Sequence, residues 1–153
     1  MIYVGIDVAK DKHDCFITNS DGEVLFKPFT ISNNREGFET LLHRIISVSD
    51  DLSKIKVGLE ATGHYSYNLL GFLLDNDLPT FVINPLHTNL YRKSLSLRKT
   101  KTDKVDAHTI ASMLMSDGKH ILTTLFRPIK PLVYSQSHFH FITYKKTPLP
   151  ISL

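Results

Sequence analysis

The amino-acid sequence predicts an α/β fold: a mixed sheet of three antiparallel strands followed by βα units, with helices on both faces. Two patterns support this prediction. Three short stretches rich in β-branched and aromatic residues open the chain, and the turn signal Asp21-Gly22 separates the second from the third. After residue 33, apolar residues at helical spacing alternate with short apolar runs, which is typical of parallel βα units. At 153 residues the chain can bury one core, so we expect one domain with an appendage.

The three opening strands are predicted over residues 2–6, 13–19 and 23–31. The first is a short apolar run that ends in Asp7, as expected of a buried strand. The second alternates between two faces, and the third contains Pro28, which is tolerated only at a sheet edge or a bulge. We therefore expect the third strand to lie at an edge or to contain a bulge.

The first helix is predicted over residues 34–48. Asn33 and Glu36 before it resemble a capping box. One face of the helix carries apolar residues at helical spacing, namely Phe38, Leu41, Leu42, Ile45 and Ile46. A tight turn over residues 61–65 follows the next strand, and an apolar helix is expected around residues 69–74.

Two further strands are predicted, over residues 55–59 and 80–83. The first ends in Glu60, and the second is closed by Asn84-Pro85. Asp7 and Glu60 thus both follow strands, and functional groups of open α/β sheets collect at the carboxyl ends of strands. Each acid taken alone is equally well explained as a solvated loop residue.

A second acidic pair lies in the stretch of residues 99–107. Asp103 and Asp106 stand three residues apart, before a helical apolar stripe formed by Ala107, Ile110, Ala111 and Leu114. Two neighbouring carboxylates repel each other unless a cation, a proton or hydrogen bonds neutralise them, and Mg²⁺ prefers oxygen ligands of this kind. The alternative is that both acids cap a helix and complement its dipole.

Charge is divided unequally along the chain, although the net charge is only +3. Residues 1–91 carry 7 Lys/Arg and 12 Asp/Glu, a balance of −5, whereas residues 92–153 carry 11 and 3, a balance of +8. This asymmetry predicts a polyanionic partner. A solvated helical face or a flexible loop would explain the charge run equally well. The cations closest to the acidic pair are Arg92, Lys93, Arg98, Lys99, Lys101 and Lys104.

The end of the chain differs in composition. Residues 118–153 contain no acidic residue and four of the seven prolines, so we divide the chain into a domain of residues 1–117 and an atypical basic tail of residues 118–153. His138 and His140 lack nearby partners for a metal site. The single Cys15 excludes an internal disulfide, and neither a signal peptide nor a membrane span is apparent, which favours a reducing, intracellular setting.

Three motifs together resemble a known family. They are Gly-Ile-Asp-Val-Ala-Lys at residues 5–10, Leu-Glu-Ala-Thr-Gly at 59–63 and Lys-Thr-Asp-Lys-Val-Asp-Ala at 101–107. In this order and spacing they resemble the amino-terminal domain of Piv/MooV-type insertion-sequence transposases, the DEDD family, over roughly residues 1–117. The resemblance implies a RuvC-like variant of the ribonuclease H fold. It also implies that Asp7, Glu60, Asp103 and Asp106 are the four catalytic acids that bind Mg²⁺, with Mn²⁺ as a substitute.

The resemblance implies DNA transposition or site-specific recombination by metal-dependent phosphoryl transfer. Two ions about 4 Å apart would stabilise the attacking and leaving oxygens. The expected partners are DNA, as insertion-sequence ends or branched junctions, an element-encoded guide RNA and further copies of the chain. The candidates for nucleic-acid binding, which the resemblance does not reach, are Lys10, Arg92, Lys93, Arg98, Lys99, Lys101 and Lys104.

Two other functions were weighed against this one. Members of the family are longer and carry a second, carboxyl-terminal domain that is not visible here, and the tail reads as truncated or frame-shifted. We therefore do not expect this chain to transpose DNA alone, and a non-catalytic DNA- or RNA-binding remnant is the alternative. A sugar-kinase or actin-like ATPase also opens with a strand ending in Asp, but it needs a glycine-rich phosphate loop that residues 8–11 lack.

Overall fold

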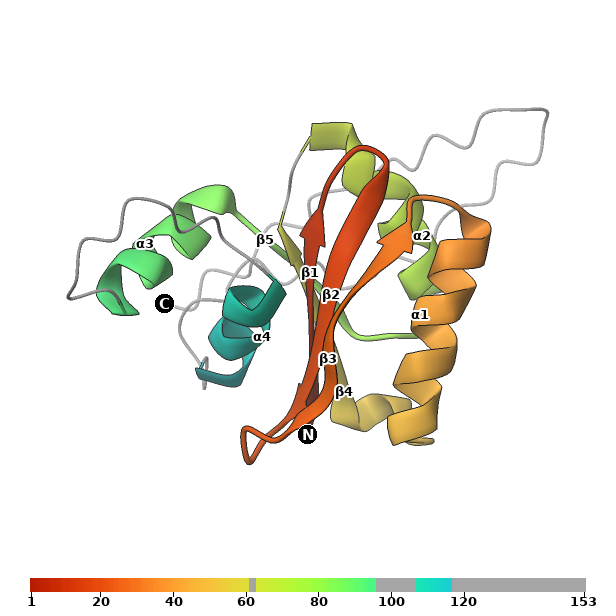
Figure 1. Ribbon diagram of the computed structural model, residues 1–153, viewed down its shortest axis with the longest axis horizontal. Coiled ribbons are helices and arrows are strands. Elements are labelled where there is room, and N and C mark those ends of the chain that lie inside the picture. Colours follow the sequence, from red (N-terminus) through yellow and green to blue (C-terminus); the bar gives the residue numbers. More distant parts are fainter. Residues whose placement is uncertain (61–62, 96–106, 117–153) are drawn as a thin grey trace, which may run out of the picture.

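The computed structural model describes residues 1–60, 63–95 and 107–116. Over these residues the chain forms five strands, four α-helices and two short 3₁₀ turns (Figure 1). Their bounds in chain order are β1 Ile2–Val8, β2 Lys12–Asn19, β3 Val24–Ser32, α1 Arg35–Val48, η1 Leu52–Lys54, β4 Ile55–Glu60, η2 Gly63–Ser66, α2 Tyr67–Asp75, β5 Thr80–Ile83, α3 Pro85–Leu95 and α4 Ala107–Ser116. No helix within these ranges is long and apolar enough to cross a membrane.

The five strands form one mixed sheet in the order β3-β2-β1-β4-β5. β1, β2 and β3 pair antiparallel, whereas β1 pairs with β4, and β4 with β5, in parallel. This order confirms the predicted mixed sheet of three antiparallel strands followed by βα units. Pro28 lies on β3, an edge strand, as predicted.

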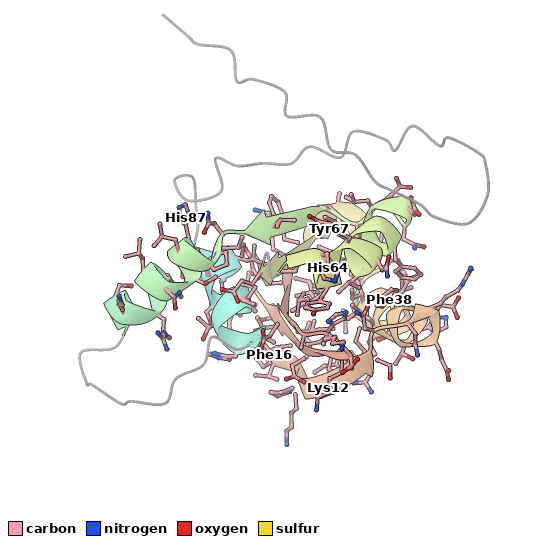
Figure 2. The ribbon with its side chains drawn as sticks, turned by 90° about the horizontal axis from the view of Figure 1, so that it is seen from above. Lys12, Phe16, Phe38, His64, Tyr67 and His87 are labelled. Carbon is pink, nitrogen blue, oxygen red and sulfur yellow. The ribbon has the colours of Figure 1, made fainter. Side chains whose placement is uncertain are left out.

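Helices cover both faces of the sheet, as predicted (Figure 1). α1 and α2 pack on one face, over a core that includes Val4, Ile6, Leu41 and Leu73. α4 covers the other face, with α3 beside it. Figure 2 shows Phe38 at α1 and Phe16 close to α4, on opposite sides of the sheet. The interior strands β1 and β2 therefore bury side chains on both faces.

The first helix begins one residue later than its sequence signal predicted. The cap is Asn34, whose side-chain oxygen accepts the Gly37 N–H at 2.9 Å, so the predicted capping box of Asn33 and Glu36 is wrong. Asn33 instead donates its amide to the Lys10 carbonyl at 2.8 Å. The predicted apolar face is also narrower than expected, because Ile46 is 42% exposed.

Candidate metal centre

Asp7 and Glu60 lie on adjacent parallel strands and project to the same face of the sheet. Ile6 of β1 is the register partner of Leu59 of β4, and both side chains belong to the core under α1 and α2. Because successive side chains of a strand alternate between faces, Asp7 and Glu60, the next residue in each strand, project toward the α4 side. Both acids are half-buried. The parallel pairing thus brings two of the four predicted metal ligands to one corner of the sheet.

A further carboxylate, which sequence reasoning missed, lies opposite Asp7 on the neighbouring strand β2. Asp14 of β2 is the register partner of Asp7, and directly opposite residues in an antiparallel pair share a face. The Thr30 hydroxyl donates to Asp14 Oδ1 at 2.6 Å, which fixes this carboxylate from the β3 side. Like charges placed directly opposite are destabilising, and a cation would offset this repulsion.

The fourth element of the site is helix α4, which packs unusually close to β1. A Cβ on Gly5 would lie 2.0 Å from the Ala107 carbonyl oxygen and 2.6 Å from the Ala111 nitrogen. Only glycine permits this approach. Ala107 and Ala111 also pack on Phe16, whose ring meets the His108 ring at 4.9 Å between centroids. The start of α4 therefore packs directly on Gly5 of β1, which lies two residues before Asp7 in that strand.

Glu60 has a hydrogen-bond partner on α3 that the sequence did not reveal. The Thr88 hydroxyl is completely buried and lies 2.5 Å from Glu60 Oε1. It also lies 2.9 Å from the Pro85 carbonyl oxygen of its own helix. Residues 85–91 lack apolar periodicity, and we predicted no helix there. Asn84-Pro85, a cap followed by proline at the first helical position, was the signal that could have indicated α3.

The predicted cations that the structure describes lie on two elements. Arg92 and Lys93 are on the last turn of α3, where Arg92 is half-buried and Lys93 exposed. Lys10 is exposed in the β1–β2 connection, directly after the strand that carries Asp7. Positive charge therefore comes from elements that also carry or contact the acids.

The connection that carries Lys10 is held by hydrogen bonds with His13 and Asn33. The Ala9 N–H donates to Nδ1 of His13 at 3.3 Å, and the Asn33 N–H donates to the Asp11 carbonyl at 2.9 Å. His13 is fully buried, and burial lowers its pKa below the ordinary value, against smaller opposing effects of Asn33 and Asp14. The neutral imidazole therefore accepts the Ala9 hydrogen bond.

The other predicted site residues, Asp103, Asp106, Arg98, Lys99, Lys101 and Lys104, lie outside the described residues. Within the described part of the chain, no three His, Cys, Asp or Glu side chains are grouped closely enough to hold a metal ion by themselves. The donors that are described, Asp7 and Glu60, are all-oxygen, which suits a hard divalent cation rather than a soft one. They fit as one half of a metal centre.

Comparison with known proteins places the chain in a family. Residues 4–129 match the DEDD transposase family of the IS110 type, described as transposase. The pilin gene-inverting protein of Moraxella lacunata is 37% identical over 110 residues, which are 71% of this chain and 33% of that protein. The putative transposase of the IS117 mini-circle from Streptomyces coelicolor is 31% identical over 117 residues, 76% of this chain and 27% of that protein.

Among solved structures, RuvC of Thermus thermophilus in complex with a Holliday junction substrate is similar at a TM-score of 0.44 and 13% identity, covering 72% of this chain and 90% of that chain. The chain spans about a third of the length of the curated relatives it matches. Because the family match covers most of the sequence and includes both described acids, the chain belongs to the DEDD transposase family.

Proposed function

We propose that this chain binds divalent metal and carries out phosphoryl transfer on DNA as the catalytic domain of a transposase or site-specific recombinase. The observation that carries the proposal is the convergence of Asp7 and Glu60 on the face of the sheet where α4 docks. Asp106 directly precedes α4 in the sequence, and α4 docks through Ala107 against Gly5 of the strand that carries Asp7. This supports a four-acid centre of Asp7, Glu60, Asp103 and Asp106.

Mg²⁺ is the proposed ion, with Mn²⁺ as a substitute, because a DEDD family implies divalent metal and the donors are carboxylates. When bound, the ions would supply Lewis-acid stabilisation of the attacking and leaving oxygens of a phosphodiester. The chain's own contribution is to hold Asp7 and Glu60 on two paired strands, where bound cations would offset the repulsion between carboxylates.

DNA is the proposed substrate, as insertion-sequence ends or branched junctions. The cations on α3 and after β1, together with Arg98, Lys99, Lys101 and Lys104, would contact the phosphate backbone without reading sequence. The relatives named above invert a gene or belong to a mobile mini-circle, which supports recombination as the reaction class. An element-encoded guide RNA and assembly of several copies remain part of the proposal.

The test combines metal binding with cleavage. We expect Mg²⁺ or Mn²⁺ to raise the thermal unfolding temperature of the full chain, since a ligand that binds only the folded state stabilises it. Asp7→Asn and Glu60→Gln should lose this rise and any metal-dependent cleavage of branched DNA. Salt-sensitive DNA binding that EDTA leaves unchanged, without any metal-dependent stabilisation, would contradict the proposal and favour a non-catalytic nucleic-acid-binding remnant.

A further inference from the structure

Thr88 presents one proton to two acceptors. Its hydroxyl is completely buried, so it must donate to a partner inside the protein. The usual partner of a helical threonine is a carbonyl one turn earlier, and the Pro85 oxygen lies 2.9 Å away. The Glu60 Oε1 atom is closer, at 2.5 Å, the short end of the range for a hydroxyl that donates to a carboxylate. An ionised carboxylate is the stronger acceptor, so the proton goes to Glu60.

We infer that Thr88 is a positioning residue that holds the Glu60 carboxylate in the orientation required for metal binding; this inference rests on the proposed function. A glutamate side chain has several rotatable bonds and loses entropy when it is fixed. The Thr88 hydrogen bond fixes it before the cation arrives. It occupies one lone pair of Oε1 and leaves the Oε2 lone pairs for a cation.

The helix that carries Thr88 is itself held at two points. At its start, the Asn84 side-chain oxygen accepts the Leu86 N–H at 2.8 Å, and the Asn84 carbonyl accepts the His87 N–H at 2.8 Å. One turn after Thr88, the Tyr91 hydroxyl and the Ser116 hydroxyl lie 2.9 Å apart, which joins α3 to α4. Thr88 therefore connects Glu60 to α3, and Tyr91 connects α3 to the last residue of α4.

A matched control residue, Thr80, distinguishes a positioning role of Thr88 from a purely structural one. Thr80 of β5 is also buried, at 5% exposure, and its hydroxyl donates to the Leu78 carbonyl at 2.9 Å. Both threonines fill space and satisfy a hydroxyl inside the protein, but only Thr88 contacts a predicted metal ligand. Replacing each by valine keeps the shape and removes the oxygen.

The experiment measures the affinity of the full chain for Mn²⁺ alone, by isothermal titration and by the metal-dependent rise in unfolding temperature. Outer partners of metal ligands typically contribute 10–100-fold to metal affinity, so we expect Thr88→Val to bind Mn²⁺ about 10–100-fold more weakly. Thr80→Val should bind like the wild type. Without metal, both variants should unfold within a few degrees of the wild type, because half-buried Glu60 can exchange its lost partner for water.

A second pair of variants separates the hydroxyl from packing. Thr88→Ser and Thr88→Ala both lose the methyl group and differ in the oxygen alone, so we expect the serine variant to keep near-wild-type affinity and the alanine variant to lose it. Equal Mn²⁺ affinity in these two, or wild-type affinity in Thr88→Val, would overturn the positioning role while leaving the proposed function intact. No Mn²⁺ binding by the wild type would overturn both.

Discussion

Gly5→Ala should displace α4 from the sheet and so disturb the proposed metal centre without changing any charged residue. The new Cβ would lie 2.0 Å from the Ala107 carbonyl oxygen and 2.6 Å from the Ala111 nitrogen. Comfortable contacts between non-bonded heavy atoms begin near about 3.5 Å, so α4 must withdraw by roughly 1–1.5 Å. Both obstructing atoms belong to the helix backbone, which cannot move aside as a side chain can.

The expected cost is about 1–3 kcal/mol of unfolding free energy, the usual range for overpacking a well-packed core. For a domain of this size, each kcal/mol lowers the unfolding temperature by about 2–4 °C. Misplacement of catalytic groups by about 1 Å is expected to lower the rate of chemistry roughly 100-fold. Metal affinity should fall as well, because Asp106 is joined directly to the displaced helix.

Gly58→Ala is the matched control on the neighbouring strand. Its Cβ would meet the Leu114 side chain, with Cδ1 at 2.7 Å and Cγ at 3.0 Å, so a side chain rather than the backbone of α4 must shift. We therefore expect a smaller displacement of α4 than in Gly5→Ala and a Mn²⁺ affinity nearer to that of the wild type. Thermal unfolding with and without Mn²⁺ measures both variants. An unfolding temperature and a metal response in Gly5→Ala equal to those of the wild type would refute the argument that glycine sets this distance.

Three further predictions concern stability. Burial lowers the pKa of His13 in the folded state, so the neutral imidazole contributes its full share to the unfolding free energy above the unfolded pKa near 6.5. This stability is lost as the pH falls from there toward the lowered folded pKa. Urea unfolding between pH 7 and 5 should show the loss, and His13→Leu should show less of it. Asp14→Asn should stabilise the metal-free protein by about 0.2–1 kcal/mol, because it relieves repulsion with Asp7, and saturating Mg²⁺ should shrink the gain; a loss of stability would contradict the shared face. Asn34→Ala should lower the unfolding free energy by about 1 kcal/mol in chemical denaturation, whereas Glu36→Ala should lower it little. The reverse order would support the capping box of Asn33 and Glu36.

The five strands and the first two helices could be predicted because their signals are local. Residues 13–19 alternate, the Asp21-Gly22 turn separates two strands, and the apolar spacing of α1 needs no distant partner. The stripe of Ala107, Ile110, Ala111 and Leu114 likewise predicted the buried face of α4, to which the structure adds Met113. By contrast, the cap of α1 is Asn34 rather than Asn33. The choice between these adjacent asparagines depends on the path of the chain after the end of β3.

The partners of the acids could not be predicted, because they come from contacts between distant segments. Asp14 lies opposite Asp7 only through the register of β1 with β2, and Thr88 reaches Glu60 only when α3 folds back over the end of β4. Neither residue carries a distinguishing sequence pattern. The resemblance to a family supplied Asp7 and Glu60, and the sheet then showed why these two acids belong together.

The contact between β1 and α4 joins the first and the last described elements of the fold, and this has a consequence for synthesis of the chain. The antiparallel strands and α1 consist of near neighbours and can form while the ribosome is still at work, whereas α4 must wait for its residues to emerge. Until then Gly5 and Phe16 have no cover on that face. A nascent chain therefore cannot complete the proposed metal centre before α4 has been synthesised.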